Sequence, residues 1–260
     1  MKFTILGSGS CYGVPAIGND WGACSPDNPK NNRTAPSLLI ETETTKILID
    51  MGPDYRQQSV RHMVTDLDAA IFTHAHADHI LGVFHLPKMM KYMKKDLPLY
   101  ATKETQAGIE RSFWYLFDTD LKIKYDGKSR HFWQDIVIGN PFTIGDITLN
   151  PLLQHHGSMD SLGLRIRDFA YCTDFCEWPD KTWKELEALD VLVIECNAKN
   201  RVTEPEEKHM YLEKTLEYIA KLAPKRAILT HLGTSMDYDS INQVLPHGVE
   251  LAYDGLVITI

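Results

Sequence analysis

The run Thr73-His74-Ala75-His76-Ala77-Asp78-His79 carries three imidazoles and one carboxylate directly after an apolar stretch. Neutral imidazole and carboxylate are ligands that zinc, manganese and iron accept. Four such donors on one turn are too many for a single closed tetrahedral site that also keeps a water molecule. The run therefore predicts a two-metal hydrolytic centre.

The sequence around this run predicts a strand, a turn and a helix. Residues 68–72 form a short apolar strand, and Asp78 and His79 open a helix that we expect to continue through Leu86. The free N–H groups at such a helix start favour anionic ligands. Other predicted elements are a hairpin, a helix and four later strands: residues 37–41 with 46–50, residues 54–63, and residues 147–154, 164–166, 169–173 and 226–230.

Three of these later strands are followed directly by a polar donor. His155 and His156 follow the strand at 147–154, Asp174 ends the hairpin at 164–173, and His231 follows the last strand. Such strand ends are where α/β enzymes place their chemistry. Each residue alone is a weak signal, but together they complete a two-metal ligand set, with the choice between His155 and His156 open.

Length and composition predict one α/β domain over residues 1–260. With 43% hydrophobic content, the chain can bury a sizeable core, and no composition change marks an internal boundary. No apolar run reaches roughly 18 residues, which is the length that a membrane span needs. Residues 1–7 indicate a strand rather than a signal peptide. We therefore expect a cytoplasmic protein.

The net charge limits the class of ligand, and the cysteine pattern indicates the redox state of the thiols. A net charge of −8 opposes binding to long nucleic acids, whose affinity depends on Lys and Arg at the phosphates. Small anionic substrates are compatible with this charge, because a metal pair supplies local positive charge. The five cysteines are scattered and form no C-x-x-C pair, which indicates reduced thiols: Cys11, Cys24, Cys172, Cys176 and Cys196.

On these residues the chain resembles the metallo-β-lactamase-fold hydrolases. The resemblance implies an α/β fold of the metallo-β-lactamase-like kind, a four-layer αβ/βα sandwich, with two divalent metal ions, zinc or manganese. It also implies the ligands: His74, His76 and His156 for the first ion, Asp78, His79 and His231 for the second, and Asp174 for both. Asp50, in Ile49-Asp50-Met51-Gly52, matches a carboxylate that orients the ligand loop.

The same resemblance decides between the two adjacent histidines. In related sequences the ligand precedes a glycine and, a few residues later, a Leu-Gly pair that opens a strand. His156-Gly157 and Leu162-Gly163 match that pattern, so we expect His156 to be the ligand. His155 then lies on the opposite side of the chain.

Within this fold the chain resembles the phosphoribosyl 1,2-cyclic phosphate phosphodiesterases, the accessory enzymes of the carbon–phosphorus lyase pathway. The resemblance rests on the metal run and on four other segments: Gly7-Ser8-Gly9-Ser10 with Gly13-Val14-Pro15, Tyr171-Cys172-Thr173-Asp174, Thr230-His231-Leu232, and Leu251-Ala252-Tyr253-Asp254-Gly255. It implies hydrolysis of a small, cyclic phosphodiester, ribosyl or nucleotide-derived, by a metal-bound hydroxide. A homodimer is expected by the same analogy.

The resemblance also implies two catalytic residues beyond metal binding. Asp78, together with Asp174, would position the attacking water. His209 stands at the start of a helix expected to begin near Lys208, and it matches the general acid that protonates the leaving alkoxide.

The chain departs from that group in its N-terminal loop. Many members carry a cysteine cluster there and a second histidine after the last ligand, which together hold a structural zinc. Here residues 16–33 contain only Cys24, and no histidine follows His231 closely, so we expect no structural zinc. For Arg33 we expect a surface position, with a contact to a substrate phosphate as the alternative.

Other functions share parts of these motifs. A tRNA 3′-processing endonuclease would need a long basic arm, whereas the insert at residues 100–140 is mixed in charge and rich in aromatics, which favours a small-molecule pocket or a dimer interface. A thioester hydrolase shares the metal run but does not need His209. A di-iron redox protein would carry Glu in place of His76 and would continue into a flavin domain. A metal-binding scaffold without catalysis ranks last.

Overall fold

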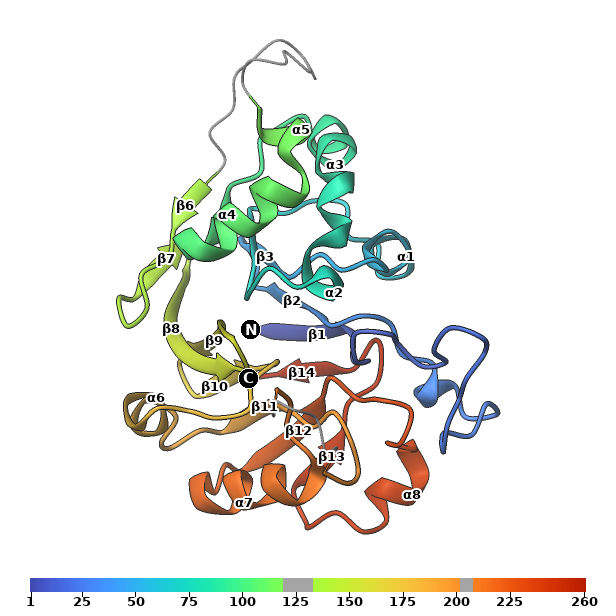
Figure 1. Cartoon of the computed structure of the whole chain (residues 1–260). Helices are drawn as coiled ribbons and strands as arrows, with labels where there is room; N and C mark the ends of the chain where they lie inside the picture. Colours follow the sequence, from blue (N-terminus) through green and yellow to red (C-terminus); the bar gives the residue numbers. More distant parts are fainter. Residues whose placement is uncertain (119–132, 202–207) are drawn as a thin grey trace.

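Two seven-stranded mixed sheets lie face to face in this protein, and helices cover their outer faces (Figure 1). The structure is a computed structural model, and it describes residues 1–118, 133–201 and 208–260. The arrangement confirms the predicted αβ/βα sandwich. No helix within these ranges is long and apolar enough to cross a membrane.

The strands follow in a simple spatial order within each sheet. The first sheet consists of β14 (Val257–Thr259), β1 (Lys2–Gly7), β2 (Ser37–Glu41), β3 (Lys46–Ile49), β4 (Ala69–Ile71), β5 (Leu99–Ala101) and β6 (Trp133–Asp135). The second consists of β13 (Val249–Leu251), β12 (Arg226–Thr230), β11 (Val191–Glu195), β10 (Phe169–Cys172), β9 (Met159–Ile166), β8 (Ile147–His156) and β7 (Phe142–Ile144). In each sheet a run of neighbouring strands is parallel: β3 to β6, and β10 to β13.

The helices divide between the two outer faces. The first sheet is covered by α1 (Tyr55–Arg61), α2 (Ala77–Ile80), α3 (Leu86–Met93), α4 (Lys103–Ser112) and α5 (Trp114–Phe117). The second is covered by α6 (Asp180–Glu185), α7 (Leu212–Leu222) and α8 (Tyr238–Asn242). Each layer has its own apolar cluster between helices and sheet.

The main core lies between the two sheets. Along β2, Leu38 and Ile40 belong to this central cluster, whereas Leu39 points to the cluster beneath the helices. Strands that are buried on both faces read as continuous apolar runs, as these do. Phe3 on β1 stacks on Phe169 on β10, with ring centroids 3.7 Å apart, so the two sheets share one interior.

The structure confirms most of the predicted strands. β2 and β3 form the expected antiparallel hairpin, with Leu38 opposite Ile49. β9 and β10 form the second hairpin, and β12 has the predicted bounds. β8 extends two residues further than expected, to His156. All five cysteines are free, as predicted. Part of the insert at 100–140, residues 119–132, lies outside the described residues.

The prediction of one helix over residues 78–86 is wrong. After α2 the chain forms a 3₁₀ turn, Leu81–His85, before α3 begins. The Gly82 N–H donates to the carbonyl oxygen of Met51, 2.6 Å away, instead of extending the helical pattern. A Cβ at residue 82 would lie 2.6–2.7 Å from two backbone oxygens, so glycine is needed for this approach. A tertiary contact therefore breaks the helix.

The helix predicted near Lys208 begins later, at Leu212. The segment before it pairs with the chain that leaves β11, since the Asn197 N–H donates to the Met210 carbonyl oxygen at 2.9 Å. A parallel bridge between Ala198 and Tyr211 continues this pairing. His209 thus lies in an extended segment that is tied to a strand end.

Arg33 is buried, and the predicted surface position is wrong. Its side chain is 2% exposed, and one guanidinium nitrogen donates to Asn31 Oδ1 at 3.1 Å. Another nitrogen lies 3.9 Å from the sulfur of Cys24. The guanidinium therefore holds the N-terminal loop together from inside.

Two weak sequence segments, one near each end of the chain, meet at Asp254. One carboxylate oxygen accepts hydrogen bonds from the N–H and the hydroxyl of Ser8, both at 2.9 Å. The other oxygen accepts from the N–H and the hydroxyl of Thr34, at 2.9 and 2.6 Å. Gly9 then pairs with Leu232 in a parallel bridge. These contacts fix the glycine-rich loop beside the end of β12.

The Phe3–Phe169 stack provides a test of the shared core. We expect Phe3→Ala to lower the free energy of unfolding by about 3–5 kcal/mol, because it leaves a cavity between the sheets. Val257→Ala, a change on the adjacent strand at a side chain that is 50% exposed, should stay within about 0.5 kcal/mol of the wild type. Urea unfolding followed by tryptophan fluorescence measures both. A loss below about 1 kcal/mol for Phe3→Ala would contradict a common core.

Candidate metal centre

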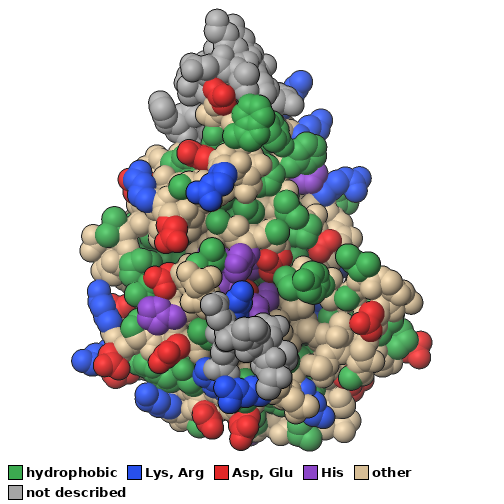
Figure 2. Space-filling view, viewed as in Figure 1, with side chains coloured by type: hydrophobic (Ala, Val, Ile, Leu, Met, Phe, Trp, Pro, Cys, Tyr) green, Lys and Arg blue, Asp and Glu red, His purple; other side chains and the backbone are tan. Residues whose placement is uncertain are grey.

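Five segments deliver polar side chains to one edge of the sandwich. The metal run follows β4, His156 ends β8, Asp174 follows β10, Glu195 ends β11 and His231 follows β12. The carboxyl ends of parallel strands meet at the same edge of a sheet, which explains why residues so distant in sequence come together. Figure 2 shows histidine side chains gathered near the middle of one face of the molecule.

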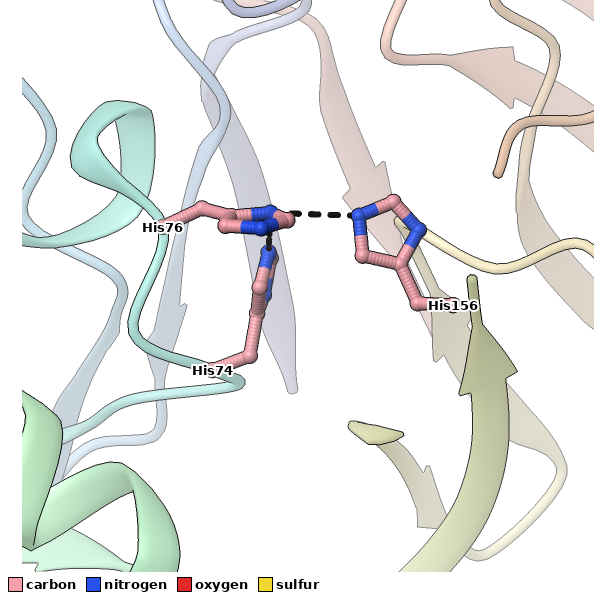
Figure 3. A group of neighbouring side chains, drawn as sticks. All are labelled: His74, His76 and His156. Atoms are coloured by element: carbon pink, nitrogen blue, oxygen red, sulfur yellow. Dashed lines mark hydrogen bonds between the residues drawn. The ribbon is translucent and has the colours of Figure 1, made fainter. Parts of the chain in front are cut away.

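The first cluster consists of His74, His76 and His156. The Nε2 atom of His74 lies 2.9 Å from Nδ1 of His76, and Nε2 of His156 lies 3.2 Å from the same atom (Figure 3). Two of these imidazoles come from the metal run and the third crosses over from the second sheet. The predicted ligands of the first ion are therefore brought together.

The donor chemistry of this cluster fits a metal ion. Nitrogens around a tetrahedral zinc ion lie about 3.3 Å apart, given Zn–N distances of about 2.0–2.1 Å. Burial lowers the pKa of His74 well below its usual value, and it also lowers the pKa of His76 and of His156. All three imidazoles are therefore neutral near pH 7, which is the form that binds metal.

The second cluster consists of Asp78, His79, Asp174 and His231. The Nε2 atom of His79 lies 3.2 Å from a carboxylate oxygen of Asp78 and 3.0 Å from one of Asp174. The Nε2 atom of His231 lies 3.5 Å from Asp78 and 3.2 Å from Asp174. All four residues are buried, so the predicted ligands of the second ion also converge.

Charge in the second cluster is balanced within the cluster. Burial opposes the charged form of His79, but Asp78, Asp174 and Asp50 outweigh it and raise its pKa well above the usual value. The pKa of His231 is raised in the same way, against burial, by carboxylates that include Asp174. These buried carboxylates are stabilised by a nearby positive charge. A divalent cation supplies that charge as well as an imidazolium does.

Asp174 faces both clusters. One of its oxygens lies 3.0 Å from His79, and the other lies 3.2 Å from His231 and 4.0 Å from Nε2 of His156. The bridging role of Asp174 stays a prediction, and this position is compatible with it. Burial would raise the pKa of Asp174, but His231 and His79 lower it well below its usual value, so the side chain stays a carboxylate.

A buried carboxylate beneath the metal run holds two of its residues in place. Asp50 accepts from the N–H and the hydroxyl of Thr73, both at 2.8 Å, and lies 2.7 Å from Nδ1 of His79. This contact leaves Nε2 of His79 to face the cluster. Nδ1 of His156 is similarly occupied by the backbone carbonyl oxygen of Lys208, at 2.7 Å. Both imidazoles are thereby oriented toward the site.

Three residues at this edge have left-handed backbone conformations. The φ angles are +62° for Asp50, +52° for Asp174 and +58° for His231. Such conformations cost of order 1–3 kcal/mol for residues other than glycine, and they persist where the surroundings fix them. Asp50 and His231 follow a strand directly and Asp174 follows one after a single residue, so each turn directs its side chain into the site.

His209 lies beside the second cluster without belonging to the predicted ligand set. Its Nδ1 atom lies 2.5 Å from an oxygen of Glu195 and 3.8 Å from Asp174. The imidazole is 29% exposed, whereas Glu195 is fully buried. Burial opposes protonation of His209, but Glu195 outweighs it and raises the pKa. A histidine that is protonated and accessible fits the role of a general acid.

Glu195 is the site residue that the sequence analysis missed. Besides His209, its carboxylate accepts from the Phe175 N–H at 2.6 Å and lies 3.3 Å from Nδ1 of His231. The run Val191–Glu195 is typical of a buried strand, and the carboxylate at its end was the feature that could have indicated a site residue. Glu195 ends a strand between those that carry Asp174 and His231, at the same edge.

His155 points away from the clusters, as predicted. Its Nδ1 atom lies 2.8 Å from Asp160, and its side chain is 44% exposed. Adjacent residues on a strand face opposite sides, so His156 alone enters the site.

A cluster of three histidines beside a cluster of histidines and aspartates, at the strand ends of an αβ/βα sandwich, is typical of metallo-β-lactamase-fold proteins. The family comparison agrees, since the Beta-lactamase superfamily domain matches residues 45–232. The chain belongs to this superfamily.

Similar proteins include a diphosphatase and a ribonuclease. A solved structure described as a new diphosphatase from the PhnP family shares 29% identity and a TM-score of 0.88, and the match covers 100% of this chain and 97% of that one. Ribonuclease Z of Pyrobaculum aerophilum is 24% identical over 269 residues, which covers 89% of this chain and 86% of that protein. The first likeness agrees with the predicted resemblance to phosphoribosyl cyclic phosphodiesterases.

An octanoyltransferase of Porphyromonas gingivalis is also similar. It is 30% identical over 258 residues, which covers 98% of this chain but 51% of that protein. The chain thus spans about half the length of this relative.

The carboxylate of Asp50 generates a prediction about metal affinity. Asp50→Asn places an NH₂ group where Thr73 and His79 need an acceptor, so His79 loses its orientation. We expect about 10–100-fold weaker metal binding, measured by competition with a chromogenic chelator. Asp160→Asn alters another aspartate–histidine pair, outside the clusters, and should leave the affinity unchanged. Equal affinities in the two variants would contradict the supporting role of Asp50.

Proposed function

We propose that this chain is a dinuclear metal-dependent phosphodiesterase that hydrolyses a small, cyclic phosphodiester, ribosyl or nucleotide-derived. The observation that carries the proposal is the His209–Glu195 pair, a buried carboxylate and an accessible imidazole placed beside two complete ligand clusters. Phosphodiester hydrolysis needs both a charged centre that activates water and a proton donor for the leaving oxygen.

The ligand clusters account for the first requirement. His74, His76 and His156 would hold one divalent ion, zinc or manganese. The second ion would be held by Asp78, His79 and His231, and Asp174 would reach both. Bound there, the two ions supply an activated water and neutralise charge on the phosphate oxygens. The carboxylates of Asp78 and Asp174 would also accept hydrogen bonds from the attacking water and so position it.

His209 accounts for the second requirement. Its Nδ1 is engaged by Glu195, so Nε2 is the atom left to donate a proton to the departing alkoxide. Glu195 is a positioning residue, because it contacts His209 and not the substrate. Its charge keeps the imidazole protonated at higher pH than an isolated histidine would allow.

The overall charge supports a small substrate. A net charge of −8 repels long polyanions, whereas the local charge of a metal pair attracts one phosphate group. We therefore favour a small phosphodiester over tRNA, although ribonuclease Z is among the similar proteins. A cytoplasmic location and a homodimer belong to the same proposal, and cell fractionation and sedimentation velocity test them.

A second candidate substrate contains a diphosphate linkage. It is favoured by the PhnP-family structure, which is described as a diphosphatase and matches nearly the full length of both chains. The same residues would serve this reaction, since the leaving group is then a phosphate rather than an alkoxide. A phosphate leaves without protonation more readily, so this reaction would depend less on His209.

The direct test is turnover by metal-reconstituted protein. The panel should contain bis-(p-nitrophenyl) phosphate, a ribose 1,2-cyclic phosphate, a nucleoside diphosphate and an acyl thioester. The thioester belongs there because one relative is named an octanoyltransferase. Diesterase turnover that a chelator abolishes is the expected result. Turnover of the thioester alone, at full metal loading, would overturn the proposal.

Removal of the proposed general acid gives a prediction that depends on the leaving group. We expect His209→Ala to lower kcat by about 10²–10⁴-fold on a diester with an alkyl leaving group. The loss should be much smaller on a p-nitrophenyl ester, whose leaving group needs no proton. Metal content, measured on the same samples, should be unchanged. Equal losses on both esters would show that His209 is not the acid.

Removal of the charge behind His209 gives a prediction about pH. Because the pKa of His209 is raised in the folded protein, its protonated form is present at low pH and is lost as the pH rises through that pKa. Glu195→Gln removes the cause, so the alkaline limb of kcat should move to lower pH. A uniform fall in kcat with an unmoved limb would assign Glu195 a structural role only.

A further inference from the structure

An apolar groove of about 530 Å³ lies on the outer layer of the molecule, between α1 and α3. None of the residues of the metal clusters lines it. Its apolar lining comes from both helices and from the segment that follows α1: Tyr55, Val60, Met63, Val64, Met89 and Tyr92. The proposed phosphodiesterase mechanism does not use this surface.

The exposure of the lining indicates a macromolecular partner. Val60 is 71% exposed, Met63 is 77% exposed and Tyr92 is 65% exposed. Sites for small molecules enclose their ligand and therefore shield their lining from solvent. Large apolar side chains that stand this far into water, side by side, are typical of an interaction surface. Phe84, 60% exposed, extends the surface because its ring packs against His85, which also lines the groove.

The charge of the groove indicates the chemistry of that partner. Arg56 and Lys88 both line it, and no acidic side chain does. Neither residue forms an ion pair with any residue that the structure describes, and both are exposed. Burial, together with the charge of Arg56, lowers the pKa of His85, so this histidine is neutral and adds no positive charge. Arg56 and Lys88 therefore form a positively charged rim on a chain whose net charge is −8. In Figure 2, Lys and Arg side chains are visible on this edge of the molecule, at the upper right.

A second copy of the chain does not fit this surface well. In a two-fold dimer the same patch faces itself, which would bring the Arg56 and Lys88 of one copy toward those of the other. Like charges opposed in this way oppose association. A nucleic acid would match the basic rim but not the apolar floor, and a membrane would match a convex apolar surface rather than a groove.

We propose that the groove between α1 and α3 binds an acidic amphipathic helix of a partner protein. The apolar face of that helix would lie on Val60, Met63 and Tyr92, and its carboxylates would face Arg56 and Lys88. This is the helix-in-groove mode of recognition, with anchors at positions i, i+3, i+4 and i+7. α3 spans Leu86–Met93, so the groove matches about two to three turns of the partner.

The proposal can be tested with a synthetic probe and the intact protein. The probe is a fluorescent helical peptide with Leu at i, i+3, i+4 and i+7 and Glu at its other positions, and its counterpart carries Lys in place of Glu. Fluorescence anisotropy should show that the acidic peptide binds at least about tenfold more tightly than the basic one, and less tightly at high salt.

Matched variants locate the binding. Arg56→Glu with Lys88→Glu should weaken the acidic peptide by at least about tenfold and improve the basic one. Val60→Ser with Met63→Ser, which changes only exposed side chains, should weaken both. Arg111→Glu with Lys184→Glu reverses two exposed charges on other helices and should change neither. Diesterase turnover should be unchanged in all three, so this inference fails or stands independently of the proposed function.

Several outcomes would overturn the proposal. One is acidic-peptide binding that none of the groove variants changes, and another is no binding at all. A wild-type dimer that Arg56→Glu with Lys88→Glu dissociates in sedimentation would assign the groove to self-association. Preferential binding of an RNA oligonucleotide, or of vesicles that contain phosphatidylserine, with the same dependence on Arg56 and Lys88 would assign it to that ligand instead.

Discussion

The balance of charge among buried imidazoles and carboxylates is the interaction on which the rest of the structure depends. Asp50, Asp174 and Glu195 are all at most 1% exposed, and an unpaired charge at such depth is strongly destabilising. Each of these carboxylates lies within hydrogen-bond distance of an imidazole: Asp50 of His79, Asp174 of His79 and His231, Glu195 of His209. Metal ions would take over the positive charge that His79 and His231 otherwise carry, so binding metal means releasing protons. Local backbone strain at the strand ends is tolerated because these contacts fix it.

The sandwich supplies the scaffold that this balance needs. Parallel strands end at one edge, and the two sheets share a core that includes Phe3 and Phe169, so residues from both sheets are held at fixed separations. Asp254 fixes the glycine-rich N-terminal loop through four hydrogen bonds, and Gly9 joins that loop to the end of β12. The weak sequence segments near the two ends of the chain are therefore parts of the same support.

The predictable parts of the site were those encoded locally. The metal run and His231 each follow an apolar strand, His156 ends another strand, and strand alternation separates His156 from His155. Glu195 was missed because a carboxylate at the end of a strand indicates a site only when the residues that end the neighbouring strands are known. The break at Gly82 and the burial of Arg33 depend on contacts between segments that are distant in sequence, with Met51 in one case and Val14 in the other, and no local pattern contains these contacts. The basic and the exposed apolar side chains of the groove come together only when α1 and α3 pack side by side.

The contacts of Glu195 explain why the group around it differs from the two ligand clusters. Asp174, Glu195, His209 and His231 also lie close enough to form a metal site. Two of these four, however, belong to the second cluster, and Nε2 of His231 already faces Asp78 and Asp174. The carboxylate of Glu195 accepts from Phe175 N–H and faces Nδ1 of both His209 and His231, which leaves it little capacity for a cation. A carboxylate in that position holds protons on imidazoles, so it serves ligand orientation at His231 and acid chemistry at His209 at the same time.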